Sequence, residues 1–348
     1  MIPPLIYTPE RSIEVFKKTE EFLIENPDLK LKIEKLSWIY HSLHNIIPTT
    51  MQSFWSGHSF PYNESWEEIQ ISFNLICFGL YKQAMTSLRS TLELGLLSVY
   101  YNINDDGHNA VKKWLSSADS KEADTPKIQD VWKILLQHEN IKKFQEQIDI
   151  KGRLLKLGFL HNYVHTKGHV FSNKLGKLKS NYQTFEKDYI EKWINTLEEI
   201  VIIVMTLHLL KYPAGLIQFD YSRKFGIDIP SFSHLREHEI ENLTKYLPTE
   251  YFQLLQEISN KDQETINFLE WVNSHPDITE EDVENQIVEM DKMDIERQGI
   301  EDYKRQQLII YRVEDFNDLS DKVKDRINKL EKWAIDNNFI EPKFKMKN

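Results

Sequence analysis

The sequence predicts an all-α protein. Apolar residues follow the helical period through nearly the whole chain of 348 residues, and only 11 Gly and 12 Pro interrupt it. No run of alternating apolar and polar residues is long enough to indicate a β-sheet. A chain of this length exceeds the usual size of one domain, so we expect two or three units, each with its own core.

Helices are predicted throughout the first two thirds of the chain. A strong helix breaker, Asn26-Pro27-Asp28, separates the first two helices, and a loop rich in Ser, Gly and Pro follows them. The longest helix begins at Ser65, which forms a capping box with Glu68, and its apolar residues cover more than one face, as expected of a central helix in a bundle. The predicted helices are residues 9–25, 29–47, 65–103, 108–117, 126–138, 153–167 and 185–210.

The last third of the chain is predicted to be a separate, acidic helical region. The segment before it contains Gly, Pro and Ser and indicates a linker. One further helix opens at Thr279 with Asp282 as its capping partner, and the last helix covers residues 317–337. The sequence therefore predicts an N-terminal helical pair, a central helical bundle, a linker and an acidic helical region, with boundaries at residues 1–60, 61–213, 214–235 and 236–348.

Cysteine content and hydropathy predict a cytoplasmic protein without a membrane partner. Cys77 is the only cysteine, so neither an intrachain disulfide nor a cysteine-based zinc finger can form. The N-terminus lacks the basic and apolar regions of a signal peptide. The longest apolar run, from Ile200 to Leu210, is about half of the roughly 20 residues that a membrane span requires, so we interpret it as part of a core helix.

Charge is segregated along the chain. The formal net charge is -11, which disfavours non-specific binding of nucleic acid by the protein as a whole. From Ile150 through Phe185, however, seven Lys or Arg residues occur without a single Asp or Glu. From Arg236 through Asp302, nineteen acidic residues occur against five basic ones. This contrast indicates two regions with different tasks, although solvated helix faces could produce part of it.

The acid-free basic stretch contains two histidines that are one helical turn apart, His161 and His165, with Asn162 between them. An imidazole exchanges a proton near neutral pH, and the surrounding positive charge suits a phosphate-bearing substrate. Two other interpretations remain open: histidines that are satisfied by neighbours in a packed helix, or a metal site in which Glu93 supplies a third ligand.

Arg89 and Glu93 form a second candidate constellation on the predicted central helix. They lie one turn apart and share a stripe with Lys82 and Thr86. Apolar residues flank the pair, so the two charges would be partly buried and would compensate each other while orienting a catalytic group. The alternative is that this stripe is the solvated face of an amphipathic helix.

Over residues 65–210 the sequence resembles the HEPN superfamily. The resemblance rests on a helix rich in Ala and Leu that carries Arg89 and Glu93, followed about seventy residues later by a segment that contains Tyr163, His165 and Lys167. The superfamily is built on a bundle of four to five helices, usually dimeric, and includes bacterial toxins, abortive-infection proteins and CRISPR-associated ribonucleases. Its active members cleave RNA without a metal at a cleft between paired bundles.

The family motif places an Arg five to seven residues before the His. His165 and the nearby polar Asn162 match this motif, but Leu160, Phe159 and Gly158 stand where the Arg is expected. Arg153 is twelve residues from His165, beyond the family spacing. Two interpretations follow: Arg89, His161 or Lys167 supplies the missing cation, or the bundle is not catalytic and binds a partner.

The resemblance implies a homodimeric ribonuclease or RNA-binding protein of a bacterial toxin or phage-defence system, without a cofactor. His165 would be the acid and base, Asn162 and His161 would position it, and Glu93 would hold Arg89 against the phosphate. The remaining candidate RNA-binding residues are Lys167, Lys174, Lys177, Lys179 and Arg153. The alternative is a non-catalytic helical module that binds a protein partner or a nucleotide, with the acidic C-terminal region docking a basic surface.

Overall fold

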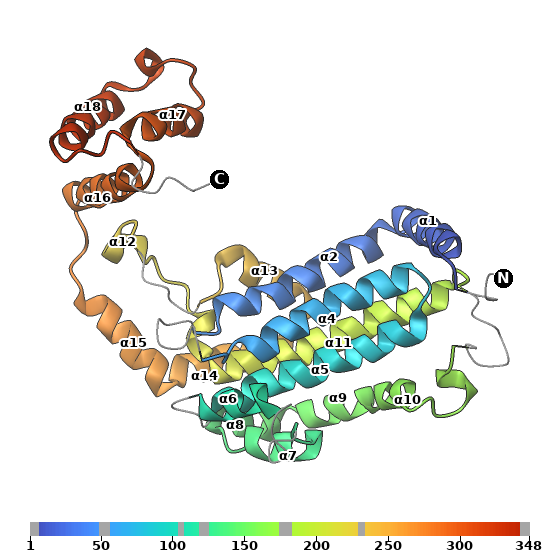
Figure 1. The fold of residues 1–348 in the computed structure, drawn as a ribbon. Helices are drawn as coiled ribbons and strands as arrows, with labels where there is room; N and C mark the ends of the chain where they lie inside the picture. The colour runs from blue at the N-terminus through green and yellow to red at the C-terminus, as the bar shows by residue number, and fades with distance from the viewer. Residues whose placement is uncertain are drawn as a thin grey trace. The chain divides into compact units, whose positions relative to one another are not determined.

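The computed structural model describes residues 7–48, 56–103, 108–117, 125–173, 183–228 and 234–341. All regular secondary structure in these ranges is helical, which confirms the predicted all-α class (Figure 1). The chain forms two compact units. The first comprises Met1–Gln218 with Ser231–Phe268, and the second comprises Phe219–Pro230 with Leu269–Asn348.

Helix α11 (Lys187–Lys211) is the centre of the first unit, and every residue from Ile200 to Leu210 is buried. Its apolar residues therefore face protein on all sides, as the sequence predicted for this run. Among the described residues, α11 is the one helix long and apolar enough to cross a membrane, yet 83% of its apolar window is buried inside the protein. Figure 1 shows α2 (Pro27–His41), α4 (Phe60–Cys77) and α5 (Tyr81–Ile103) running alongside it.

The predicted single helix over residues 65–103 is wrong, because the structure divides it into α4 and α5, which pack against each other as a hairpin. The chain reverses at Gly79, whose φ of 74° is in the left-handed region. The Leu80 amide donates to the Leu75 carbonyl and the Gly79 amide to the Ile76 carbonyl, which is the Schellman pattern of a helix end. Gly79, which the helical period predicted inside a helix, therefore ends one.

Ser65 is not a helix cap. It lies inside α4, is fully buried, and donates a hydrogen bond of 2.7 Å from Oγ to the carbonyl of Thr91 on α5. The apparent capping box therefore reflects an interhelical contact. By contrast, the capping box predicted at Thr279 is confirmed at the start of α16 (Glu280–Gln298).

Gly95 allows α5 to approach its neighbours closely. A Cβ atom at this position would lie 2.7 Å from Cγ2 of Val204 on α11 and 2.9 Å from the hydroxyl of Tyr40 on α2. Three helices therefore meet at a point where only glycine fits without a shift of the surrounding atoms.

The remaining helices of the first unit surround this centre. Helix α1 (Pro9–Glu25) has the predicted bounds, whereas the helix predicted over residues 29–47 is α2 followed by a 3-10 turn. The helix predicted over residues 153–167 is three short segments. The other elements are η1 (Ser42–Asn45), α6 (Asn109–Leu115), α7 (Ile128–Leu135), α8 (Glu139–Gln147), α9 (Ile150–Lys156), η3 (Leu157–Phe159), α10 (Leu160–Val164), η4 (His169–Phe171), η5 (Pro213–Leu216), α13 (Glu237–Tyr246) and α14 (Thr249–Lys261).

The second unit has a small core of its own. Ile295, Tyr303 and Leu330 are buried in it with four other apolar residues. The boundary between the units falls within α15 (Gln263–Ser274). The helices assigned wholly to this unit are α12 (Ser222–Phe225), α16, α17 (Ile300–Tyr311), η6 (Phe316–Asp318) and α18 (Asp321–Asp336).

The boundaries of the two units differ from the predicted boundaries of the linker and the acidic region. Residues 236–268 are acidic, yet Tyr251, Leu254 and Leu255 of α14 are buried in the core of the first unit. Acidic side chains lie on the solvated face of a helix. The compact unit to which a helix belongs is determined by the residues on its buried face. The predicted linker is likewise divided, since Phe219–Pro230 belongs to the second unit.

Candidate functional site

The two histidines of the basic stretch lie side by side on α10, where His161 is in the first turn and His165 directly follows the last residue. Their ring centroids are 4.2 Å apart, and both side chains are exposed. The backbone amide of His165 donates to the carbonyl of His161, so the last turn of the helix sets their relative position. Directly after them, Thr166 with φ of 46° and Gly168 with φ of 79° turn the chain away from the helix axis.

Helix α5 supplies the charged groups beside this pair. Nη2 and Nε of Arg89 donate to Oε1 of Glu93 at 2.8 and 3.0 Å. The two side chains are 23% and 35% exposed, so the pair is partly buried, as the sequence predicted. On the same helix, Nζ of Lys82 donates a hydrogen bond of 2.6 Å to the Thr166 hydroxyl and thereby ties α5 to the turn after α10.

A groove of about 580 Å³ joins these elements, and Arg89, Glu93 and His161 all line it. Its other walls are mainly apolar and come from α5, α7, α9 and α10, with Leu96, Val131 and further leucines. A volume of this size accommodates one nucleotide or a comparable small ligand. The sequence identified the two polar constellations separately, and the fold brings Arg89, Glu93 and His161 to one groove, whereas His165 is not among its lining residues.

Desolvation and the neighbouring charges together determine the protonation of His161. Desolvation lowers the pKa of His161, and the neighbouring His165, Arg89 and Lys167 lower it further, whereas Glu93 acts in the opposite direction. His161 is therefore mainly neutral at pH 7 and able to accept a proton. Because Arg89 and Lys167 both affect this pKa, the His161 imidazole lies within electrostatic range of these two predicted cations.

Asn162 and Lys167 lie next to the histidines in the chain. Asn162 is partly buried, and its backbone carbonyl accepts a hydrogen bond of 3.0 Å from the amide of Lys167. The Lys167 side chain is exposed. Lys174, Lys177 and Lys179 lie outside the described residues.

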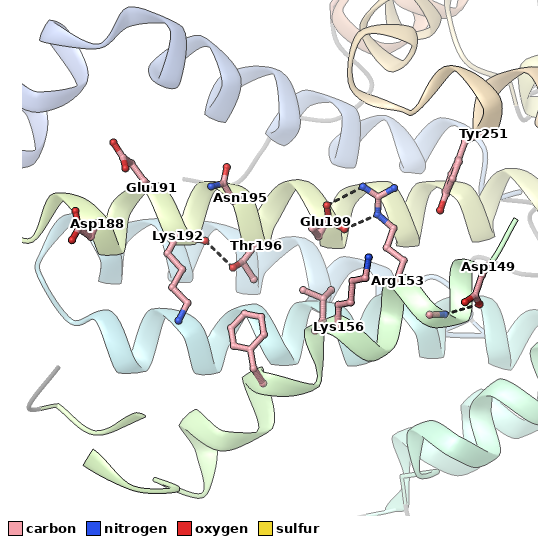
Figure 2. A pocket seen from close by; sticks show the side chains of 13 residues that line it. Asp149, Arg153, Lys156, Asp188, Glu191, Lys192, Asn195, Thr196, Glu199 and Tyr251 are labelled. Carbon is pink, nitrogen blue, oxygen red and sulfur yellow. Dashed lines mark hydrogen bonds and ion pairs between the residues drawn. The ribbon is translucent and has the colours of Figure 1, made fainter. Parts of the chain in front are cut away.

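Arg153, the other predicted RNA-binding residue, belongs to a different site. It donates to both carboxylate oxygens of Glu199, at 2.6 and 2.9 Å, and its guanidinium lies 5.4 Å from the centroid of the Tyr251 ring. These contacts join α9 to α11 and α14 beside a second cavity, which is shown in Figure 2. The bidentate contact with Glu199 compensates the charge of Arg153, so the main role of this residue is to join α9 to α11.

Lys82 is the residue at this site that the sequence prediction left without a role. It was visible as part of the stripe with Arg89, but only the fold shows that its ammonium reaches Thr166 beside His165. Among the described residues, no cluster of three or more His, Cys, Asp or Glu side chains is placed to hold a metal ion. The donor set therefore gives no support to a metal site formed by His161, His165 and Glu93.

No family model matches the chain, and no curated protein or solved structure matches it. The site combines two exposed imidazoles, a carboxylate-bound arginine and the lysines Lys82 and Lys167, and Arg89, Glu93 and His161 of this set line a groove. Such a set can bind a phosphodiester and move protons to and from it.

Proposed function

We propose that this protein is a metal-independent ribonuclease whose active site is the pair of His161 and His165 beside Arg89 and Glu93. The observation that supports this proposal best is the position of the two imidazoles, which are exposed to solvent with ring centroids 4.2 Å apart, and of which His161 is within electrostatic range of Arg89 and Lys167. A buried imidazole without a cation beside it would have excluded RNA cleavage here. The HEPN-like bundle that the sequence suggests is consistent with this function.

The mechanism needs one proton acceptor and one proton donor. His161, which is mainly neutral at pH 7, takes the proton of the ribose 2′-hydroxyl as that oxygen attacks the adjacent phosphorus. His165 in its protonated form gives a proton to the departing 5′-oxygen, so a 2′,3′-cyclic phosphate and a 5′-hydroxyl are formed. Arg89, Lys82 and Lys167 stabilise the charge that develops on the phosphoryl oxygens. Glu93 holds Arg89 in place.

The decisive experiment uses the full-length protein and a structured RNA at pH 7, with and without EDTA. We expect cleavage that EDTA does not inhibit, with 2′,3′-cyclic phosphate ends detected by mass spectrometry. His165→Ala and His161→Ala should each reduce the cleavage rate by about 100-fold or more. His238→Ala, which changes an exposed histidine on α13, is the matched control and should leave the rate unchanged. Cleavage that survives the loss of His165 would remove this function.

The resemblance also suggests a cellular setting. We propose a cytoplasmic toxin or phage-defence ribonuclease that acts as a homodimer, with RNA approaching the groove between two paired bundles. Light scattering coupled to size-exclusion chromatography should give twice the mass of the chain. If a monomer cleaves RNA at the full rate, the dimer proposal is wrong and the catalytic proposal stands.

A non-catalytic interaction module is the second candidate, and one observation favours it. In the acidic second unit, several large apolar side chains are exposed, among them Met293 at 66% and Ile309 at 77%. A protein partner with a basic rim and an apolar centre would cover such residues. If this candidate is right, the purified protein leaves RNA intact, and Ile309→Asp weakens binding of the partner without affecting the fold.

A further inference from the structure

Between α1, α2 and α4 lies an apolar groove of about 790 Å³ that the RNA-cleavage proposal does not use, and we call it the N-terminal groove. The three helices belong to the first unit, and each of them contacts the other two. The N-terminal groove shares no lining residue with the groove beside His161. Its volume is in the range of small-molecule sites, so a ligand of that size could be largely enclosed.

Aromatic side chains are prominent in the lining of the N-terminal groove. Trp38 of α2 is 65% exposed, so most of its indole is open to a ligand. Its ring lies edge-to-face with the ring of His41, with centroids 5.8 Å apart, and His41 lies edge-to-face with Trp66 of α4 at 5.3 Å. These three rings therefore form one continuous aromatic surface across two helices. Phe16 of α1 and Phe73 of α4 add two further rings to the lining.

Buried apolar residues from all three helices complete the lining. Leu23 of α1, Ile33 of α2 and Ile69 of α4 line the groove and also belong to the core of the first unit, as does Cys77. Core packing therefore fixes the inner surface of the groove, and its shape does not depend on a ligand. An apolar ligand that enters the groove removes this surface from water, which favours binding.

The charged residues of the lining determine which aromatic ligand fits. Besides His41, the lining contains Glu20 on α1 and Lys30 and Glu34 on α2, and all three are exposed. Within the described part of the chain, none of these three side chains forms an ion pair. Lys30 acts against a cationic ligand, but the two carboxylates outweigh it by one negative charge. The lining therefore favours a cation over an anion.

We propose that the N-terminal groove binds a small planar aromatic cation. Its rings pack on the indoles of Trp38 and Trp66, whose faces attract positive charge. A charge that is delocalised over a ring system is weakly hydrated, so it enters an apolar groove at less cost than a compact ammonium. Direct contact with both carboxylates is not required, because their potential extends over about 10 Å at 0.1 M salt. A neutral aromatic compound gains the ring contacts alone and binds more weakly.

The test compares the binding of three fluorescent probes to the full-length protein at pH 7 and low ionic strength. Berberine is a planar aromatic cation, N-phenylnaphthylamine is neutral, and anilinonaphthalenesulfonate adds a negative charge to the ring system of the neutral probe. We expect berberine to bind at one site per chain, at least about tenfold more tightly than anilinonaphthalenesulfonate, with the neutral probe between them. Equal or tighter binding of the anion would overturn the proposal.

Two charge variants on α2 test the electrostatic preference. Glu34→Gln should weaken berberine binding about threefold, and Lys30→Gln, one helical turn away, should strengthen it by a similar factor. Neither change should affect the binding of N-phenylnaphthylamine. If both variants changed berberine binding in the same direction, the charges of the lining would not select the ligand, and the proposal of a cation would be wrong.

Trp38→Ala tests the position of the site. Because this side chain is mostly exposed, the variant should keep the circular dichroism spectrum of the native protein and bind berberine at least about fivefold more weakly. Leu31→Ala, at an exposed position of α2 outside the lining, is the matched control and should bind berberine normally. If Trp38→Ala instead converted a dimer to a monomer and left berberine binding unchanged, a second copy of the chain would cover the groove, and the proposal would be wrong. None of these measurements depends on RNA cleavage, so a failure of the ribonuclease proposal is recorded independently.

Discussion

Arg89 donates two hydrogen bonds to a single oxygen of Glu93, Oε1, at 2.8 and 3.0 Å. This arrangement uses Nε and Nη2 and leaves Nη1 of the guanidinium available to a ligand in the groove. Glu93 thus fixes the orientation of the arginine without occupying its whole donor edge. It also places a negative and a positive charge together near His161, and this leads to the first prediction.

The pKa of His161 should respond in opposite directions to the loss of these two charges. Arg89 lowers this pKa and Glu93 raises it, after the larger effects of desolvation and His165. Arg89→Gln should therefore raise the pKa of His161 toward its ordinary value, and Glu93→Gln should lower it further. NMR titration of the imidazole Cε1–H resonances measures both changes without depending on activity. Equal shifts in the two variants would show that the pair does not act on His161.

Lys167 and Arg153 should differ in their effect on RNA binding. Lys167 is exposed near His161, so Lys167→Gln should weaken binding and reduce the slope of log K against log salt concentration by about 0.7, the value for one contact to single-stranded RNA. Arg153 is held by Glu199, so Arg153→Gln should leave this slope unchanged.

The measurement is fluorescence anisotropy with a labelled RNA at several salt concentrations. Arg153→Gln should show its effect in urea unfolding, where loss of a partly buried bidentate pair is expected to cost about 1–3 kcal/mol. If Arg153→Gln lowered the salt slope and Lys167→Gln did not, the basic stretch would bind RNA on the face of α9, away from the histidines.

Sequence patterns predicted the helices well where one element is long and its surroundings are simple. The apolar run of α11 and the bounds of α1 are both reproduced in the structure. The reversal at Gly79 was missed because helical periodicity continues on both sides of it, and a glycine inside such a pattern can be either a helical residue or a helix end. Helix α8 was missed because Ile141 and Phe144 are its only buried apolar residues, and two residues are too short a periodic signal.

The residue types of the candidate site could be predicted from the sequence, but which residues come together there could be predicted only in part. Spacing alone places His161 beside His165 and Arg89 beside Glu93, since each pair is one turn apart on one helix. Proximity in the chain suggested that Arg153 joins them, but α9 directs it toward Glu199 on α11. The direction of a side chain depends on which helix packs against which, and local sequence does not contain that information.

Gly95 should be intolerant of a larger side chain. Gly95→Val places atoms within 3.0 Å of both Val204 and Tyr40, so we expect a loss of about 1–3 kcal/mol in the free energy of unfolding. Gly158 is the matched control, because a Cβ there has no atom within 4 Å. Gly158→Ala should be neutral or stabilising by up to about 1 kcal/mol, since it reduces the entropy of the unfolded chain. Urea unfolding followed by tryptophan fluorescence compares the two.

A buried histidine should make the first unit sensitive to acid. His208 on α11 is fully buried, its Nδ1 donates to the Val204 carbonyl at 2.8 Å, and its Nε2 accepts from the Ser98 hydroxyl at 3.0 Å. Burial lowers the pKa of His208 to about 4, against about 6.5 in the unfolded chain. The unfolded state therefore binds the proton first, and stability that is complete above pH 6.5 is lost as the pH falls toward 4.

His208→Gln removes this proton linkage and keeps a polar side chain at the site. Between pH 7 and pH 5, the free energy of unfolding of the native sequence should fall by about 2 kcal/mol more than that of the variant. His138, whose pKa burial also lowers to about 4, is present in both proteins and leaves a residual slope. His238→Gln, at an exposed position on α13, should keep the full pH dependence of the native sequence. Parallel stability curves for the native sequence and His208→Gln would mean that the ring of His208 meets solvent before the unit unfolds.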